Sequence, residues 1–255
     1  MAIIDNLVSY WKLDEASGDA IDAHGDNDGT TTGVTYSDTG IINTGLGFGG
    51  DGDRITISDV AELRPGTGAW SISLWFKAAD ASQASVLYGK WNTNDPYNQY
   101  IIWIGSPTSG WSVDSSKRMG YVEIDAYPTQ AQFWRSDDDV VDGNYHHIVW
   151  TRDTSGNITL YVDGDSADIT QTLDKGTPPY DIDNTEDVTI GALNSAASPF
   201  TGQVDEIGVW NRELTSGEVT ALYNSGDGFA YPFTEEEPTI GITAIMTTNT
   251  KFWGS

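Results

Sequence analysis

Acidic and amide side chains gather in one short stretch near the start of the chain. The run from Asp22 to Gly29 reads DAHGDNDG, so oxygen-bearing side chains recur at short intervals between glycines that permit sharp turns. Calcium takes about six to eight oxygen ligands, and such a run can supply several of them. It is not an EF-hand, because no Glu stands at its twelfth position and no apolar helices flank it. The alternative is that these residues form turns by bonding their own backbone.

Two further carboxylates have a spacing that suits acid–base catalysis. Glu123 and Asp125 stand two residues apart. On a strand, their side chains would face the same side, roughly 6–7 Å from each other. That separation lies near the spacing of the paired carboxylates in glycoside hydrolases. The alternative is that both are acidic residues on the solvent-facing side of a strand.

Aromatic residues with amides and carboxylates nearby offer a third kind of chemistry. Sugar rings present apolar C–H faces that stack on Trp and Tyr, while Asp and Asn bond the hydroxyls. The interval 91–140 is rich in both types. The candidates for contact with a sugar are Trp111, Tyr97, Asp95, Tyr127 and Trp134. The alternative for all of them is ordinary packing of loops and strands.

Other catalytic arrangements find little support. His146 and His147 are adjacent on an expected strand, so their side chains point to opposite faces and cannot share a metal. The chain has no Cys, which removes thiol chemistry and disulfides. The glycines of 45–50 resemble a dinucleotide-binding loop only in spacing, because no helix pattern follows them.

The charge balance limits the kinds of ligand. The 255-residue chain carries 12 basic and 38 acidic residues, a formal net charge of −26. Such a surface repels polyanions, so we expect no nucleic-acid partner. The acidity serves solubility, or part of it holds a hard cation such as calcium. No apolar stretch approaches the ~20 residues of a membrane span and no signal-peptide pattern begins the chain, so we expect no membrane insertion.

Alternation of apolar and polar residues with a period of two dominates the chain and predicts strands. The run 71–76 places Ile72, Leu74 and Phe76 on one face. Similar or purely apolar runs occupy 54–57, 147–150, 157–162 and 204–210. Clusters of Gly, Asp and Asn separate these runs and predict turns. Many short strands at this spacing predict an all-β fold of two sheets packed as a sandwich.

One short helix is indicated near residue 220. Thr215 and Glu218 form a capping-box pattern, in which both side chains satisfy free amides of the first turn. Leu214 and Val219 occupy the apolar positions that flank such a cap. The run Asn224–Gly226 stops the helix. We expect it to pack on an edge of the sandwich.

The composition changes after the expected domain, which covers residues 1–232. Residues 233–238 contain three consecutive glutamates and a proline and are typical of a linker. Residues 239–255 are rich in Ile and Thr, with Lys251 as their only charged residue. Such a segment can add a strand to a neighbour's sheet edge. We expect an anchor to a capsid or fibre subunit or to another copy of this chain, and the alternative is a disordered end.

Six short motifs follow one another between residues 7 and 225. They are LVSYWKLDE at 7–15, FGGD and RITI within 48–57, SISLWF at 71–76, YHHIV and LYVDG within 145–164, TIG and GQVDEI within 189–207, and WNR with the helix within 210–223. Their order resembles that of the laminin-G-like, concanavalin A-like lectin/glucanase jelly-roll family. Tyr145 departs from the Trp that is usual there, and the interval 91–140 matches no family motif.

The resemblance implies a two-sheet antiparallel jelly roll with one short edge helix. It also implies calcium at one rim and the binding of sugars or proteins without catalysis. In this family one metal is shared by the early loop, the loop after the second motif and the Asp of the closing strand. Carried over by position, the metal candidates are Asp22, Asn27, Asp51 and Asp205. Asp205 is the strongest of these, because an unpaired carboxylate in an apolar strand is costly to bury.

The resemblance also bears on Glu123 and Asp125. The letters EID at 123–125 begin like the E-I-D-x-x-E strand of laminarinase-like enzymes, which share this fold. The second Glu is missing, because position 128 is Pro. No separate nucleophile and acid/base pair remains. We therefore expect no enzyme, and we interpret both residues as acids on a solvent-facing strand.

These observations predict a non-catalytic, calcium-stabilised module that recognises a cell-surface glycan. Such modules act outside cells, whereas this chain shows no export signal. A virion protein reconciles the two, because it is made in the host cytoplasm and exposed after release. We therefore expect an adhesion protein on the virion surface, in phage head decoration or a fibre, with an extracellular or bacterial cell-surface protein as the alternative. A purely structural decoration or assembly protein and a laminarinase-like glycoside hydrolase are the competing functions.

Overall fold

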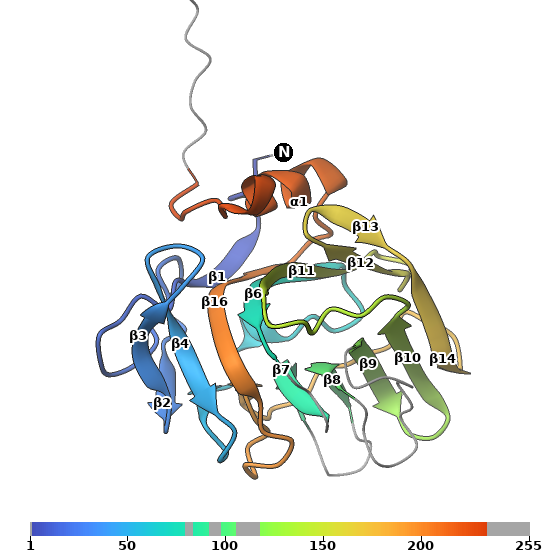
Figure 1. Ribbon diagram of the computed structural model, residues 1–255. Helices are drawn as coiled ribbons and strands as arrows, with labels where there is room; N and C mark the ends of the chain where they lie inside the picture. Colours follow the sequence, from blue (N-terminus) through green and yellow to red (C-terminus); the bar gives the residue numbers. More distant parts are fainter. Residues whose placement is uncertain (1, 80–83, 92–97, 106–117, 234–255) are drawn as a thin grey trace, which may run out of the picture.

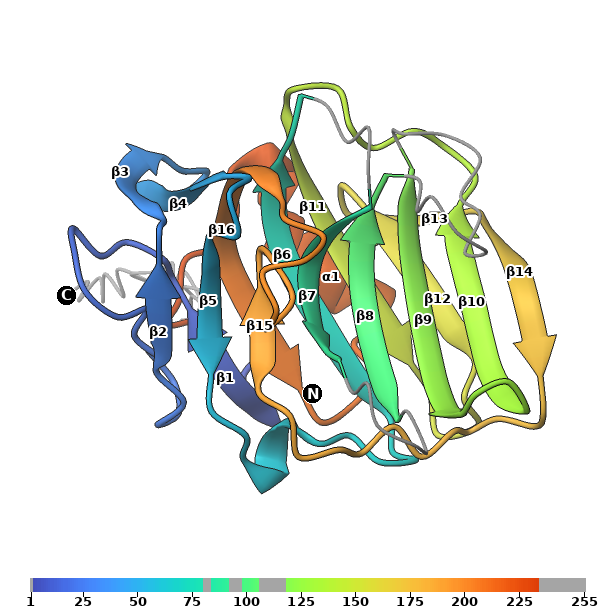
Figure 2. The same cartoon turned by 90° about the horizontal axis from the view of Figure 1, so that it is seen from below.

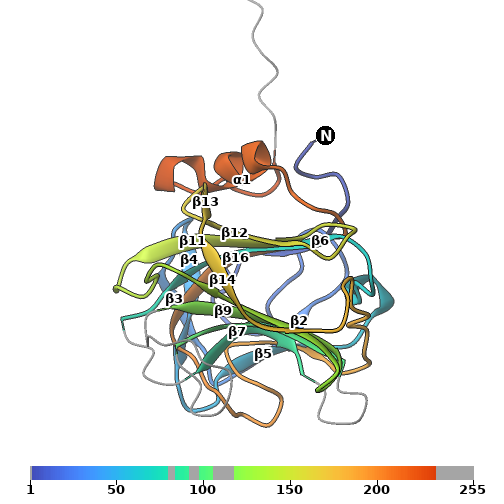
Figure 3. The same cartoon turned by 90° about the vertical axis from the view of Figure 1, so that its right-hand side faces the viewer.

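The computed structural model describes residues 2–79, 84–91, 98–105 and 118–233. Its strands form two stacked sheets, which Figure 1 and Figure 3 show from two sides. The first sheet contains β1 (Leu7–Trp11), β3 (Thr35–Thr39), β4 (Thr44–Gly49), β6 (Trp70–Lys77), β11 (Tyr145–Arg152), β12 (Ile158–Val162), β13 (Asp165–Ala167) and β16 (Thr201–Trp210). The second sheet contains β2 (Gly29–Thr32), β5 (Arg54–Ile57), β7 (Ser85–Lys90), β8 (Gln99–Ile104), β9 (Met119–Ala126), β10 (Gln130–Ser136), β14 (Ile169–Lys175) and β15 (Val188–Ile190).

Neighbouring strands within each sheet run antiparallel. The first sheet has the order β13-β12-β11-β6-β16-β4-β3, with β1 also paired to β16. The second has the order β14-β10-β9-β8-β7-β15-β5-β2, which Figure 2 shows face on. Several of these neighbours, such as β6 with β16 and β7 with β15, are distant in sequence, as the crossing connections of a jelly roll require. The predicted two-sheet jelly-roll sandwich is therefore confirmed.

The main core lies between the two sheets and follows the predicted alternation. Ile72, Leu74 and Phe76 on β6 are almost fully buried and belong to one apolar cluster. Ile102 and Ile104 on β8 reach the same cluster from the second sheet. Burying a side chain of this size contributes about 1.5–3 kcal/mol, so the pattern of these strands fixes which face of each sheet turns inward.

The helix α1 (Ser216–Tyr223) covers the outer side of the first sheet, as Figure 3 shows. Its predicted capping box is present, because Thr215 accepts a hydrogen bond from the amide of Glu218 and the Glu218 carboxylate accepts one from the amide of Thr215. Leu214 and Val219 are buried in a second cluster with Trp210. Two short 3-10 turns, η1 (Ala61–Leu63) and η2 (Asn224–Gly226), complete the elements.

The end of the described chain folds back onto the first sheet. The ring of Tyr231 stacks on Tyr10 of β1 with 5.1 Å between centroids, and its hydroxyl lies 3.1 Å from His24 Nδ1. Phe229 and Phe233 pack against the same cluster. No helix within the described ranges is long and apolar enough to cross a membrane. The predicted anchor at 239–255 and residues 234–238 of the predicted linker lie outside these ranges.

Candidate functional site

Two adjacent carboxylates are buried at an irregular point of β16. Asp205 is fully buried and Glu206 is 3 % exposed. The pairing of β16 with β6 shifts register between Asp205 and Gly208, and Glu206 has a φ of 49°. This bulge turns Glu206 out of the normal alternation. One oxygen of Asp205, Oδ2, accepts hydrogen bonds from the amides of Ile41 at 2.7 Å and Ile42 at 3.2 Å.

Two other oxygens of this pair have no donors. Asp205 Oδ1 and Glu206 Oε2 are buried without a hydrogen-bond partner in the described part of the chain. Burial, followed by the charge of Glu206, raises the pKa of Asp205 to about 8. Burial also raises the pKa of Glu206 to about 7, although a hydrogen bond from the Tyr10 hydroxyl opposes this. Two buried oxygens without donors provide acceptors that a cation could satisfy.

The other predicted metal residues lie in different surroundings. Asp22 Oδ1 accepts hydrogen bonds from the amides of Tyr10, His24 and Gly25, and Asp22 Oδ2 accepts one from Asn27. The side chain of Asn27 donates to Ser9 Oγ. A carboxylate that faces four N–H donors is a poor cation ligand, because those donors repel positive charge.

Asp51 is exposed in the loop between β4 and β5. In the described residues, no group of three or more His, Asp or Glu side chains is placed to hold a metal ion. Of the predicted metal residues, Asp205 is the one with a buried oxygen that has no donor, whereas both oxygens of Asp22 accept hydrogen bonds. Sequence reasoning missed Glu206, although its place beside Asp205 in an apolar strand carries the same signal.

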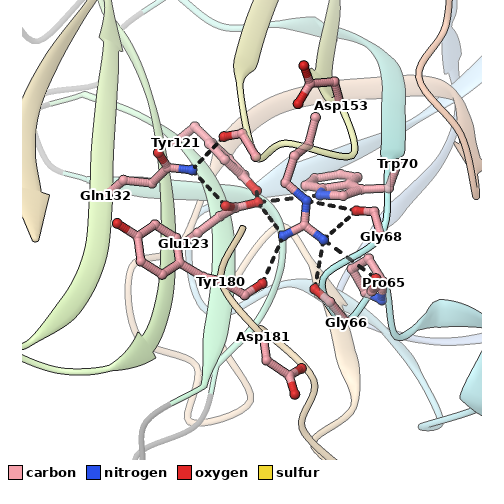
Figure 4. A network of polar contacts seen from close by, with 12 residues as sticks. Pro65, Gly66, Gly68, Trp70, Tyr121, Glu123, Gln132, Asp153, Tyr180 and Asp181 are labelled. Carbon is pink, nitrogen blue, oxygen red and sulfur yellow. Dashed lines mark hydrogen bonds and ion pairs between the residues drawn. The ribbon is translucent and has the colours of Figure 1, made fainter. Parts of the chain in front are cut away.

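Glu123 lies at the centre of a buried polar network, which Figure 4 shows. Its side chain is fully buried, and its Oε1 lies 3.0 Å from Nη1 of Arg152, which is equally buried. Glu123 also accepts hydrogen bonds from the Tyr121 hydroxyl and, at 2.8 Å, from Gln132 Nε2. Both of its oxygens are therefore engaged, and neither is available as a general acid or nucleophile.

The expectation that Glu123 lies on a solvent-facing strand is wrong. Tyr121 and Glu123 point into the sandwich, whereas Val122 and Ile124 point outward and are buried in a third apolar cluster with Phe133. Because both faces of β9 are covered, alternation alone could not tell which face turns inward. Arg152, which neutralises Glu123, follows an apolar run on β11 and was also missed.

Arg152 ties several segments to this network. Its Nη2 donates to the carbonyls of Gly66 at 2.7 Å and Gly68 at 2.6 Å, and its Nη1 donates to the carbonyl of Tyr180 at 3.3 Å. The guanidinium thus joins the loop before β6 and the segment before β15 to Glu123 of the second sheet (Figure 4). This Glu123–Arg152 network holds one end of the sandwich together.

That end carries an exposed aromatic side chain. Tyr127, which follows the last residue of β9, is 50 % exposed. Two residues earlier, half-buried Asp125 accepts a hydrogen bond of 3.5 Å from the amide of Asn98, which also donates to the carbonyl of Asp181 at 2.7 Å. We call Asn98, Asp125, Tyr127 and Asp181 the β9 rim. An aromatic face beside an amide and a carboxylate is a combination that can hold a sugar.

The other predicted sugar contacts are distributed differently. Trp134 of β10 is partly buried and packs against the main core. Trp111, Tyr97 and Asp95 lie outside the described residues. Of the five candidates, Tyr127 is the one that the described structure presents to solvent on the β9 rim.

The two histidines point to opposite faces, as predicted. His146 Nδ1 lies 2.8 Å from Asp163, and the partnership with this carboxylate is the main cause of the raised pKa of His146. His147 is buried, and its Nε2 lies 2.8 Å from Ser73 Oγ. Burial lowers the pKa of His147 to about 3. His147 is therefore a neutral side chain of the interior beneath the ring of Tyr223.

The described chain is thus an antiparallel jelly-roll sandwich without a free acid/base pair at 123–125. A family model described as the concanavalin A-like lectin/glucanases superfamily matches residues 48–220. The chain belongs to this family. No curated protein sequence matches it.

Solved structures share the fold at low identity. The binding domain of Paraclostridial Mosquitocidal Protein 1 matches with a TM-score of 0.65 and 17% identity over 88% of this chain and 53% of that one. The botulinum neurotoxin serotype D/C VPI 5993 binding domain gives 0.64 and 13% over the same shares, 88% and 53%. The chain thus spans about half the length of these toxin domains.

A further match has nearly the same length as this chain. Domain 4 of AbnA, a GH43 extracellular arabinanase from Geobacillus stearothermophilus solved in complex with arabinotriose, has a TM-score of 0.60 and 19% identity. The match covers 85% of this chain and 97% of that one. At such identities, the matches establish the fold alone.

Proposed function

We propose that this domain is a non-catalytic recognition module that binds a cell-surface glycan. The observation that carries the proposal is the β9 rim, where exposed Tyr127 follows two residues after Asp125, whose carboxylate accepts a hydrogen bond from the side chain of Asn98. Sugar sites combine these elements, because the ring stacks on C–H faces and the polar groups fix the hydroxyls. The sugar-bound arabinanase domain and the toxin binding domains of the same fold are consistent with this role.

The hydrogen bonds and ion pair that engage Glu123 support a role without catalysis. A retaining or inverting glycosidase needs two carboxyl groups that can reach the scissile bond. Glu123 is instead enclosed between Arg152, Tyr121 and Gln132. Asp125 alone supplies no such pair.

We also propose that a calcium ion stabilises the domain at the β16 bulge. Asp205 Oδ1 and Glu206 Oε2 would hold it, because both are buried acceptors without donors. The ion would neutralise two carboxylates that burial otherwise disfavours. Asp22 and Asn27 would support the neighbouring loop through their hydrogen bonds.

For the biological setting, we propose a virion-surface adhesion protein whose residues 239–255 join a capsid or fibre subunit. The composition of that segment and the acidic residues before it motivate this placement. An extracellular or bacterial cell-surface location is the alternative. A purely structural decoration protein is the second candidate function, and it would need no exposed sugar site.

A glycan-array screen of the full chain, with calcium and with excess chelator, tests the proposal. We expect defined glycans to bind and to be recovered with no new reducing ends. An array on which nothing binds in either buffer contradicts glycan recognition and favours the structural candidate. Release of new reducing ends from a bound glycan contradicts the role without catalysis.

A further inference from the structure

The surroundings of the β9 rim carry negative charge on several elements. Half-buried Asp125 is the last residue but one of β9, and exposed Asp181 and Asp183 stand on the segment between β14 and β15. Figure 4 shows the side chain of Asp181 directed away from Glu123. None of these three carboxylates belongs to an ion pair between described residues.

Contacts join that segment to the end of β9 and to the turn that follows it. Asn98 joins the end of β9 to residue 181 through its two hydrogen bonds. Gly176 lies against the turn that holds Tyr127, since a Cβ added there would meet Thr129 O at 3.0 Å. A ligand at Tyr127 would therefore lie close to Asp125 and on the side of the molecule where the segment with Asp181 and Asp183 adds negative charge.

Three of the cations at this end of the sandwich, Arg152, Lys90 and Arg64, bind carboxylates. Arg152 is fully buried against Glu123. The ammonium of Lys90, fully buried, and the guanidinium of Arg64 both bind Asp59. The hydrogen bond from Arg64 is the main cause that lowers the pKa of Asp59 to about 2. Lys175 is exposed at the end of β14, but the equally exposed Asp174 stands next to it.

We infer that the β9 rim selects its glycan by charge: it accepts neutral or amine-bearing sugars and rejects sugars that carry carboxylates or sulfates. This inference rests on the proposed function of the same rim. In water, three unit negative charges about 8 Å from an anionic sugar would lower its affinity about tenfold at low ionic strength. Salt weakens the effect, because the Debye length falls to about 8 Å at physiological ionic strength.

An array that pairs each neutral glycan with its acidic derivative, read at low and physiological salt, tests the inference. We expect neutral or free-amine glycans to bind, and their uronate or sulfated counterparts to bind about tenfold more weakly at low salt. The difference should shrink as salt is added. The triple variant Asp125→Asn/Asp181→Asn/Asp183→Asn should also reduce the difference, because it removes three negative charges. Each Asn keeps an acceptor oxygen for the present hydrogen bond, so the local structure is retained.

A matched control changes the same amount of charge elsewhere. The triple variant Asp165→Asn/Glu213→Gln/Asp227→Asn alters three exposed acids near α1, on the opposite side from the second sheet (Figure 3). It should leave the preference for neutral sugars unchanged. Acidic glycans that bind as tightly as their neutral parents at low salt overturn the inference and leave glycan recognition intact. If both triple variants reduce the preference for neutral sugars equally, the assignment of this preference to the β9 rim is overturned. An array without any bound glycan overturns the proposed function and this inference with it.

Discussion

Replacing Arg152 with Met tests the Glu123–Arg152 network directly. The change removes the ion pair with Glu123 and the hydrogen bonds to the carbonyls of Gly66, Gly68 and Tyr180. It leaves a fully buried carboxylate without its cation. Removing one partner of such a pair costs about 3–5 kcal/mol. Since a domain is stable by only about 5–15 kcal/mol, Arg152→Met should lose a large part of its stability.

The companion variants separate the charge from the packing. Glu123→Gln should cost less, because a neutral amide is cheaper to bury than a carboxylate and Arg152 keeps its carbonyl partners. In the double variant Glu123→Gln/Arg152→Met no charge is left buried, so its loss should fall at least about 1 kcal/mol short of the sum of the single losses. Urea unfolding followed by tryptophan fluorescence measures all three. A loss below about 1 kcal/mol for Arg152→Met, or strictly additive losses, would refute the reasoning.

Three further predictions concern other parts of the molecule. Calcium should raise the melting temperature of the wild-type chain, and Asp205→Asn should abolish the rise. The Asn keeps an acceptor oxygen for the amides of Ile41 and Ile42. Equal calcium shifts in both proteins would contradict the proposed site. Burial lowers the pKa of His147 to about 3 from an ordinary 6.5, so between these pH values the unfolded chain binds a proton that the folded protein does not. Above pH 6.5 this costs no stability, and as the pH falls toward 3 the free energy of unfolding should drop by up to roughly 5 kcal/mol. Chemical unfolding at pH 7 and pH 4.5 should show a smaller loss for His147→Asn than for the wild type, and identical losses would refute this assignment. Deleting residues 234–255 should leave the melting temperature and glycan binding unchanged and should abolish incorporation into the virion proposed above. Normal incorporation of the truncated chain would contradict the proposed anchor.

Local signals in the sequence predicted much of the fold. The alternation in 71–76 placed Ile72, Leu74 and Phe76 in the core, because a period of two leaves one face of a strand uniformly apolar. The capping box at Thr215 and Glu218 located the helix, since both partners lie within one turn. Such features depend on neighbours in sequence and need no knowledge of the packing.

The candidate site depended on contacts between distant residues and was harder to predict. Glu123 was assigned to the wrong face because its inward position depends on Arg152, 29 residues away, and on an apolar cluster that covers the other face of β9. The acidic run that begins at Asp22 looked like a set of cation ligands. Its first carboxylate accepts hydrogen bonds from backbone amides, as the alternative of a turn-forming run predicts.

The affinity of the Tyr127→Ala variant for a glycan identified on the array tests the central claim most directly. Stacking on an aromatic ring contributes on the order of 1–3 kcal/mol, so we expect titration calorimetry to show binding at least about fivefold weaker than wild type, with an unchanged melting temperature. Ile21→Ala, at a residue 48 % exposed, is the matched control and should bind like the wild type. Unchanged affinity of Tyr127→Ala for that glycan would contradict the claim that the β9 rim is the binding site.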